Sequence, residues 1–550
     1  MIITPGASAD GAMTVTHSDD DELADQRIIR VPAMDHAPGA MRPVMPERYP
    51  FPRLNTKGRG PHYDLQDWPH TEPTGVIPQV AHTYAYFDGN YGIMNEHNLM
   101  MGECTNAARY QPGFVSAETA EHTGKHIRLF YSNELSRVAL ERCKTARHAI
   151  EVMGEMIDTY GFFGEGETLL VADQKEAWVF ELCALPDEGD AHSCWVAQRV
   201  PDGEIFVAAN TFRIREVPSA AYEQIHTDDL AGKLEKVGYY DPKEGGVDWL
   251  KAISPGEYNH PYYSLRRIWR MFDRMNPDLG LSPWVEGTYT TYYPFSIKPR
   301  ARLKLQEIFN LYRDHYEGTE FDLTRGTAAG PYGDPHRFTG PYDGKQNDPS
   351  ARIAHGAWER AISVFYQGYT FVLQTRPDVP EYAKGIMWLA PDVSATSVFA
   401  PFYAKVAHLP DSYQTGNPRA YDPDVAWWVF DFLANWVRLN FQRMMTVDVT
   451  PKQQALEEQM QCDVADMDAH LGNCADPVAD ATAFCSKTAE ELLETWRVLG
   501  HELIAKYSDG YINRTPEDDQ MAVPIGYPAR WLAQTDYANG PTSYAMKNER

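Results

Sequence analysis

The first twenty residues constrain the fold more than any other segment of the chain. Residues 2–4 form a short run with β-branched side chains, residues 5–11 are rich in turn formers, and residues 12–17 alternate in size and polarity. This order predicts an antiparallel β-hairpin. Its second strand returns along the first and brings residues 17–20 next to the α-amino group of Met1. An ionisable cluster is therefore expected beside a free amine.

A free amine beside ionisable groups suits one class of hydrolase. In N-terminal-nucleophile enzymes the side chain of the first residue attacks a carbonyl, and its own amine, with an ordinary pKa of roughly 7.7–8.0, acts as the base. The hairpin therefore favours amide hydrolysis as the chemistry of this chain.

Four short motifs carry a resemblance to a known family: ThrProGlyAlaSerAlaAspGly at 4–11, ThrHisSerAspAsp at 16–20, TyrGlyIleMetAsnGluHis at 91–97 and MetGlyGluCysThr at 101–105. With them the sequence resembles the C69 dipeptidases, which are relatives of penicillin V acylase and bile salt hydrolase. The resemblance implies a cysteine-type dipeptidase that acts on small peptides and needs neither a metal nor an organic cofactor. It also implies a four-layer αββα sandwich, with long loop insertions and C-terminal helices added here.

The resemblance also locates a departure from the family pattern. Members of the family begin their mature chain with Cys-Thr, and alignment on the Asp10-Gly11 turn places that cysteine about three residues before Met1. Either Met1 is an internal methionine of a longer, processed protein, which we favour, or this member has lost its nucleophile. The alternatives are an inactive, secernin-like binding protein and an acylase of non-peptide amides.

Four residues are expected in the catalytic site. The resemblance implies that Asp20 holds the terminal ammonium, that Asn95 donates to the oxyanion, and that Asn210 contacts the terminal amine and the scissile bond. His17 lies where many relatives carry an arginine, and only a protonated imidazole could replace that charge. A donor to the developing oxyanion is typically worth about 10²–10³ in rate.

Other reactive side chains are given ordinary structural roles. Cys104 is interpreted as a buried core thiol, because an internal cysteine lacks the amine that would serve as its base. Arg266 and Arg270 share a face of a predicted helix and are interpreted as solvated surface, with capture of a peptide carboxylate as the alternative. Cys183 and Cys194 flank a predicted turn, where they could pair.

Composition excludes several partners. Against 50 Lys and Arg the chain has 77 Asp and Glu, and a net charge of −27 disfavours nucleic acid. No apolar run approaches the ~18–20 residues of a membrane span. No signal peptide precedes the hairpin, so the compartment stays undetermined with the cytoplasm as default, and homo-oligomer formation is left open.

The remaining pattern predicts an α+β protein with a hydrolase core over 1–430 and a helical extension over 431–550. Strands are expected at 27–31, 82–87, 91–94, 98–102, 169–172, 177–180, 194–197, 204–209, 361–365, 371–373, 385–388 and 397–399. Helices are expected at 133–143, 145–161, 265–275, 302–315, 425–445, 451–468 and 479–507. The Gly- and Pro-rich loop 326–344 is expected over a functional face or an interface.

Overall fold

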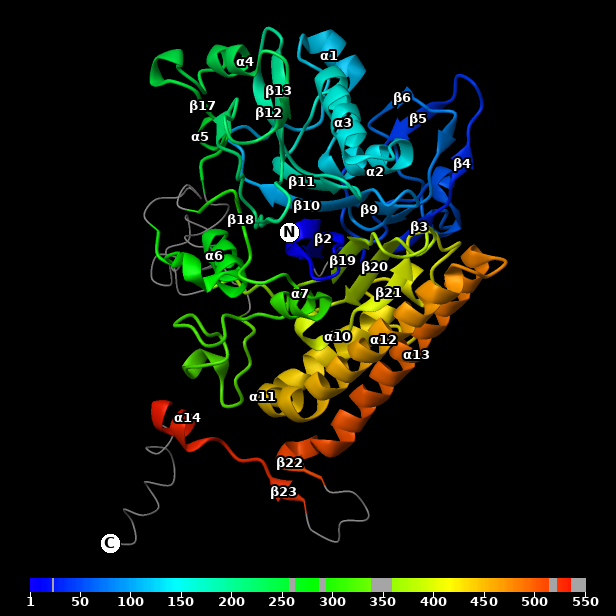
Figure 1. The fold of residues 1–550 in the computed structure, drawn as a ribbon, viewed down its shortest axis with the longest axis vertical. Coiled ribbons are helices and arrows are strands. Elements are labelled where there is room, and N and C mark those ends of the chain that lie inside the picture. The colour runs from blue at the N-terminus through cyan, green and yellow to red at the C-terminus, as the bar shows by residue number, and fades with distance from the viewer. Residues whose placement is uncertain (22–23, 257–262, 286–292, 338–358, 514–521, 536–550) are drawn as a thin grey trace.

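The computed structural model describes residues 1–21, 24–256, 263–285, 293–337, 359–513 and 522–535. Two large antiparallel sheets form its centre, so the α+β prediction is confirmed. In Figure 1, helices α2 and α3 lie on one side of these sheets, and α10, α12 and α13 lie on the other. Among the described helices, none is both long and apolar enough to cross a lipid bilayer.

The first sheet, which we call the amino-terminal sheet, contains the predicted hairpin. Its strand order is β18-β14-β1-β2-β19-β20-β21. The bounds are β1 Ile2–Ile3, β2 Met13–Asp19, β14 Ile205–Phe206, β18 Ser296–Ile297, β19 Tyr369–Thr375, β20 Gly385–Pro391 and β21 Ala400–Tyr403. β1 is an inner strand, because it pairs with β2 on one side and with β14 on the other.

The second sheet has the order β16-β13-β12-β11-β10-β9-β8-β3. The bounds are β3 Ile29–Val31, β8 Tyr86–Asp88, β9 Gly92–Asn95, β10 Met100–Asn106, β11 Gly166–Ala172, β12 Ala177–Glu188, β13 Ala191–Arg199 and β16 Gln224–His226. Four two-stranded ribbons are β4 Met34–Asp35 with β7 His82–Thr83, β5 Met41–Val44 with β6 Gly75–Pro78, β15 Glu216–Val217 with β17 Val247–Asp248, and β22 Tyr511–Ile512 with β23 Val523–Pro524.

The helices follow the predicted periodicity most closely where they are long. Their bounds are α1 Ala117–Thr123, α2 Ser132–Arg142, α3 Ala146–Tyr160, α4 Leu230–Lys236, α5 Trp249–Ile253, α6 Leu265–Met275, α7 Leu305–Leu311, α9 Asp411–Gln414, α10 Ala426–Val437, α11 Phe441–Met444, α12 Thr450–Leu471, α13 Pro477–Lys506 and α14 Ala529–Gln534. The hydroxyl of Thr145 caps α3 by accepting from the His148 amide, and Gly161 ends it at a φ of 69°.

Strand alternation explains why the core has two parts. In β11, Leu170 and Ala172 belong to the cluster that includes Ile2 and Val15 of the amino-terminal sheet. The neighbouring side chains Leu169 and Val171 belong to the cluster under α2 and α3. Because successive side chains leave opposite faces of a strand, one buried strand joins both clusters.

Several predicted elements are wrong in extent. Residues 361–365 form no strand. The side chains of 361–364 are buried at the approach to β19, and this burial accounts for the apolar run. The predicted strand at 397–399 precedes β21, and the predicted strand at 82–87 is divided between β7 and β8. Part of the loop 326–344 lies outside the described residues.

A buried ion network connects α2 to the sheet beneath it. The carboxylate of Glu134 accepts from Arg42 at 2.8 Å, Arg59 at 2.7 Å and Arg137 at 3.2 Å. Burial alone would raise the pKa of Glu134, but the three guanidinium groups hold it well below its usual range. Arg137 also donates to the carbonyl of Asn90 at 3.0 Å, so the network fixes the turn between β8 and β9.

We expect Glu134→Gln to destabilise the protein by about 3–5 kcal/mol, because three buried guanidinium groups lose their shared anion. Urea denaturation followed by tryptophan fluorescence measures this loss. The control is Glu118→Gln, since Glu118 is exposed on α1, and it should change the free energy of unfolding by no more than about 0.5 kcal/mol. Equal effects of the two substitutions would contradict the network's role.

Candidate active site

A cavity of ≈ 440 Å³ opens at the end of β2, beside the α-amino group of Met1. It is formed by the end of the hairpin, by β10, by the segment that follows β14, and by residues near α6 and β19. The titratable side chains in its wall are His17, Asp19, Asp20, Asp21, Glu47, Tyr49, Tyr91, Glu103, Cys104, Tyr131, Glu165, Tyr263, Arg267, Tyr312 and Arg360. Met1 and the acidic end of the hairpin therefore line the same cavity.

The terminal amine is held by strand pairing. The Met1 nitrogen donates to the carbonyl of Thr16 at 2.9 Å, and the Thr16 amide donates back to the Met1 carbonyl at 2.9 Å. Burial lowers the pKa of this amine to about 5, with a smaller opposing effect from Cys104. Burial at this end of β1 therefore favours the uncharged form of an amine.

Arg360 joins two of the predicted site residues. Its Nη2 donates to Oδ2 of Asp20 at 2.5 Å, and its Nη1 donates to Oδ1 of Asn210 at 3.2 Å. Arg267 donates to the same amide oxygen at 2.8 Å. Asp20 and Asn210 are thus brought to one wall of the cavity, although 190 residues separate them in the sequence.

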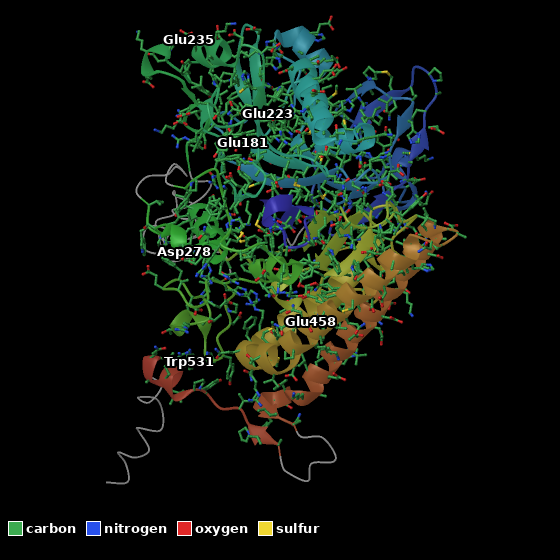
Figure 2. All side chains as sticks on the ribbon, in the orientation of Figure 1. Glu181, Glu223, Glu235, Asp278, Glu458 and Trp531 are labelled. Atoms are coloured by element: carbon green, nitrogen blue, oxygen red, sulfur yellow. The ribbon has the colours of Figure 1, made fainter. Side chains whose placement is uncertain are left out.

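The backbone at Asn210 is held from several sides. Its φ of 53° lies in the left-handed region, which Asn tolerates better than most residues. Its amide nitrogen donates to the sulfur of Cys104 at 2.8 Å, and its Nδ2 donates to the carbonyl of Thr105 at 2.7 Å. Three residues further on, the amide of Arg213 donates to the buried carboxylate of Glu181 at 2.6 Å. Glu181 is labelled in Figure 2.

Several other side chains of the wall are acidic and buried. Burial raises the pKa of Asp19 to about 8, despite the hydrogen bond that it accepts from Asn90. Burial also raises the pKa of Glu103 to about 7, and Glu103 is hydrogen-bonded to Glu167, whose own pKa lies well above its usual value because it is buried. These carboxyl groups retain protons near neutral pH and would give them up to an approaching cation.

His17 lies in the cavity wall, but its imidazole does not carry the positive charge that it would need to replace an arginine. Its Nδ1 lies 2.9 Å from the carbonyl oxygen of Glu103, and burial lowers the pKa of its imidazole to about 4. At neutral pH this histidine is neutral and cannot replace a family arginine. The positive charge near the site comes from Arg267 and Arg360.

Asn95 does not reach the cavity. Its Nδ2 donates to the carbonyls of Leu140 at 2.9 Å and Cys143 at 2.8 Å, and its Oδ1 accepts from the amides of His97 and Leu99. The side chain is fully buried, and its hydrogen bonds tie the corner after β9 to α2. The structure therefore places Asn95 as a corner residue and does not bring it together with Asp20 and Asn210.

The arginines on α6 correct another interpretation. Arg266 and Arg270 are buried instead of solvated: Arg270 pairs with Asp314 at 2.7 Å, and Arg266 lies over the ring of Phe321. Arg267, which lies between them in the sequence, is the one that reaches the cavity. The two thiols of Cys183 and Cys194 face each other at 3.7 Å without a disulfide.

Sequence reasoning missed three residues of the wall. Arg360 follows a loop without periodicity, and nothing in the sequence connects it to Asp20. Arg267 lies on α6, where the helical spacing pointed to Arg266 and Arg270 on another face. Cys104 was set aside as a core thiol; it is buried, and burial raises its pKa to about 11, but its sulfur lies in the cavity wall beside Asn210.

The raised pKa of Asp19 gives a testable stability effect. Because the folded-state pKa of about 8 exceeds the unfolded value of about 3.9, this group stabilises the fold most at low pH and loses that contribution as the pH rises toward about 8. The folded protein binds up to one proton more than the unfolded chain at Asp19. Asp19→Asn removes this difference, so the slope of the unfolding free energy with pH should change by up to about 1.4 kcal/mol per pH unit.

Urea denaturation at several pH values between about 5 and about 8 measures the slope. The variant should lose stability less steeply than the parent protein, and Asp67→Asn, at an exposed position, should keep the parental slope. Identical slopes for the parent protein and Asp19→Asn would show that Asp19 is ionised in the fold.

Comparison with known proteins assigns the family. The sequence profile described as Peptidase family C69 matches residues 72–454. A probable dipeptidase of Salmonella dublin is 27% identical over 286 residues, which cover 52% of this chain and 56% of the relative. A probable dipeptidase of Latilactobacillus sakei is 23% identical over 352 residues (64% and 66%), and dipeptidase A of Lactobacillus helveticus is 23% identical over 272 residues (49% and 50%).

The chain thus spans about half to two thirds of the length of these relatives. The match to the family profile covers more than half of the chain and includes β8 to β13 of the second sheet together with β19 to β21 of the amino-terminal sheet. The chain therefore belongs to peptidase family C69.

Proposed function

We propose that this protein is a cysteine-type dipeptidase whose nucleophile is the side chain of a residue preceding Met1. One observation carries the proposal: Asp20, Asn210 and Met1 line the same cavity. Membership of a peptidase family and similarity to proteins named dipeptidases support peptide hydrolysis. In this proposal the two sheets and their flanking helices form the αββα sandwich of N-terminal-nucleophile hydrolases.

The register of the amino-terminal sheet supports the position of the nucleophile. β1 pairs Ile2 with Val15 on one side and with Phe206 on the other. In antiparallel pairing, each step toward the amino terminus moves one residue forward on both neighbours. Counted on this register, a residue three positions ahead of Met1 lies opposite Asp19 of β2. On the other side the count reaches Asn210, which follows the end of β14 at Phe206.

That position is the one the resemblance independently requires. The family's cysteine was expected about three residues before Met1 from an alignment on the Asp10-Gly11 turn alone. The strand register, which uses none of those turn residues, leads to the same place beside Asn210. Two separate arguments therefore converge on one wall of the cavity.

The proposed chemistry follows from the groups in this wall. The α-amine of the proposed amino-terminal cysteine takes the proton of its own thiol, and the sulfur bonds to the scissile carbonyl carbon. The same amine then protonates the leaving amino group as the C–N bond breaks. Water, deprotonated by the same amine, hydrolyses the thioester and restores the thiol. The Nδ2 of Asn210 has a second hydrogen, beyond the one donated to Thr105, that can stabilise the oxyanion.

The charges of the cavity suit a zwitterionic substrate. Asp19 and Glu103 lie in the acidic part of the wall, whereas Arg267 and Arg360 belong to the part around Asn210. A dipeptide has an ammonium group at one end and a carboxylate at the other, within the reach of a cavity of this size. In this proposal the ammonium group enters the acidic part, and the carboxylate is attracted to the arginines.

The function is tested by supplying the nucleophile. We expect a chain in which Cys-Thr-Val precedes Met1, released by proteolysis so that Cys is the first residue, to hydrolyse dipeptides. Asn210→Ala in that background should lower kcat/KM by about 10²-fold or more, whereas Asn435→Ala on the exposed face of α10 should not. Release of free amino acids, with and without a thiol blocker, is the measurement.

A matched chain that begins Ser-Thr-Val controls for folding and lacks the thiol. If the Cys-Thr-Val chain is folded and correctly processed but does not hydrolyse dipeptides, the enzyme proposal fails. Dipeptide binding without hydrolysis would then favour the binding-protein alternative. Hydrolysis of penicillin V or bile salts in place of dipeptides would favour the acylase alternative.

A further inference from the structure

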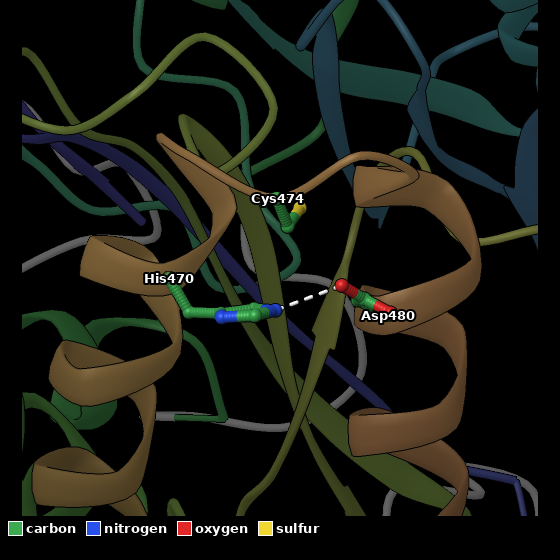
Figure 3. Close-up of side chains that lie close together, drawn as sticks. All are labelled: His470, Cys474 and Asp480. Carbon is green, nitrogen blue, oxygen red and sulfur yellow. Dashed lines mark hydrogen bonds and ion pairs between the residues drawn. The ribbon is translucent and has the colours of Figure 1, made fainter.

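A cluster of three different metal-ligating side chains lies far from the cavity, where α12 passes into α13. His470 is in the last turn of α12, Cys474 is in the short connection, and Asp480 is in the first turn of α13. One ligand atom from each side chain lies within 4.8 Å of the others. Figure 3 shows His470 and Asp480 facing each other between the two helices, with Cys474 in the connection beside them.

We propose that His470, Cys474 and Asp480 bind a zinc ion that links the end of α12 to the start of α13. This site is separate from the proposed hydrolysis, which involves no metal. The cysteines near the carboxyl terminus lack the CxxC spacing of familiar zinc sites, so local sequence pattern gives no sign of this site. Here the ligands come from two helices and the turn between them.

The chemistry of the three ligands selects zinc. Thiolate, imidazole and carboxylate are each ordinary zinc ligands, at about 2.3, 2.0–2.1 and 2.0–2.2 Å from the metal. Calcium and magnesium prefer oxygen ligands only, so a sulfur and a nitrogen ligand disfavour both. Three protein ligands leave the fourth tetrahedral position for water.

Zinc coordination by these three side chains requires only small side-chain movements. Tetrahedral zinc with those bond lengths separates its ligand atoms by about 3.3–3.6 Å. The Nε2 of His470 now lies 2.8 Å from Oδ2 of Asp480, as a hydrogen bond. The side chains of His470 and Asp480 are 53% and 41% exposed, so each can rotate without disturbing the core.

Binding would exchange a hydrogen-bonded pair for a metal bridge. The thiol of Cys474 loses its proton to solvent as the zinc–sulfur bond forms, and no electron is transferred. Because zinc would hold the folded helix pair and not the separated helices, it would stabilise the protein by mass action. The stabilised elements are α12 and α13, both of which pack against β21 of the amino-terminal sheet.

The proposal is tested by titrating the reduced protein with zinc chloride in a calorimeter and with cobalt(II) in a spectrophotometer. We expect one zinc ion per chain and a thiolate-to-cobalt charge-transfer band. Cys474→Ser should abolish the band, and His470→Ala and Asp480→Asn should each weaken zinc binding at least about tenfold. Zinc should also raise the melting temperature of the parent protein and leave that of Cys474→Ser unchanged.

Two variants control for binding elsewhere on the surface. Cys462→Ser removes an exposed thiol of α12, and His82→Ala removes an exposed histidine that pairs with Asp35; neither should change the titration. The proposal is overturned if Cys474→Ser binds cobalt with the same band, or if the parent protein binds no zinc. Zinc binding that survives all three ligand substitutions would be an adventitious ion only. None of these readouts depends on hydrolysis.

Discussion

The ion pair between Asp20 and Arg360 is the interaction on which the candidate active site depends. It joins the end of the amino-terminal hairpin to a residue 340 positions later in the chain, and Arg360 extends the link to the amide of Asn210. The pair is almost buried, with side chains 10% and 5% exposed. Such a pair contributes little net stability, but breaking it leaves an uncompensated charge. Its geometry therefore fixes which groups face the cavity.

The cavity combines groups whose pKa values are shifted in opposite directions by the same cause. Burial lowers the pKa of the Met1 amine to about 5 and raises that of Asp19 to about 8. Burial thus favours the uncharged amine, and it keeps the carboxyl group protonated until a cation replaces the missing solvent. Shifted pKa values of this kind are common at functional sites. Groups whose pKa lies near neutral pH can gain or lose a proton at little cost in free energy when a ligand binds.

Short-range sequence pattern predicts the amino-terminal hairpin and several helices correctly. The hairpin, the two helices around Thr145 and the exact span of α6 follow from turn residues, caps and periodicity, and the structure confirms them. Asp20 was found because it ends a predicted strand beside the chain's own amine. Asn210 was found through the resemblance, and its place at a strand end agrees with the structure.

The features that the sequence does not predict are contacts between residues far apart in the chain. Arg360 pairs with Asp20 across 340 residues of sequence, and no periodic pattern surrounds it. Asn95 has the residue type of an oxyanion donor, but its amide is already used by the backbone of α2 and of its own corner. Choosing between Arg266, Arg267 and Arg270 required knowledge of which face α6 buries, and all three are largely buried.

The most direct test of the central claim is calorimetric binding of a dipeptide analogue whose scissile amide is replaced by a methylene-amine bond, with its amino and carboxyl ends free. We expect one bound analogue per chain, binding lost when the amino end is acetylated, and binding at least about tenfold weaker in Asp20→Asn. Equal affinity for the free and acetylated analogues, or unchanged affinity in Asp20→Asn, would contradict the central claim.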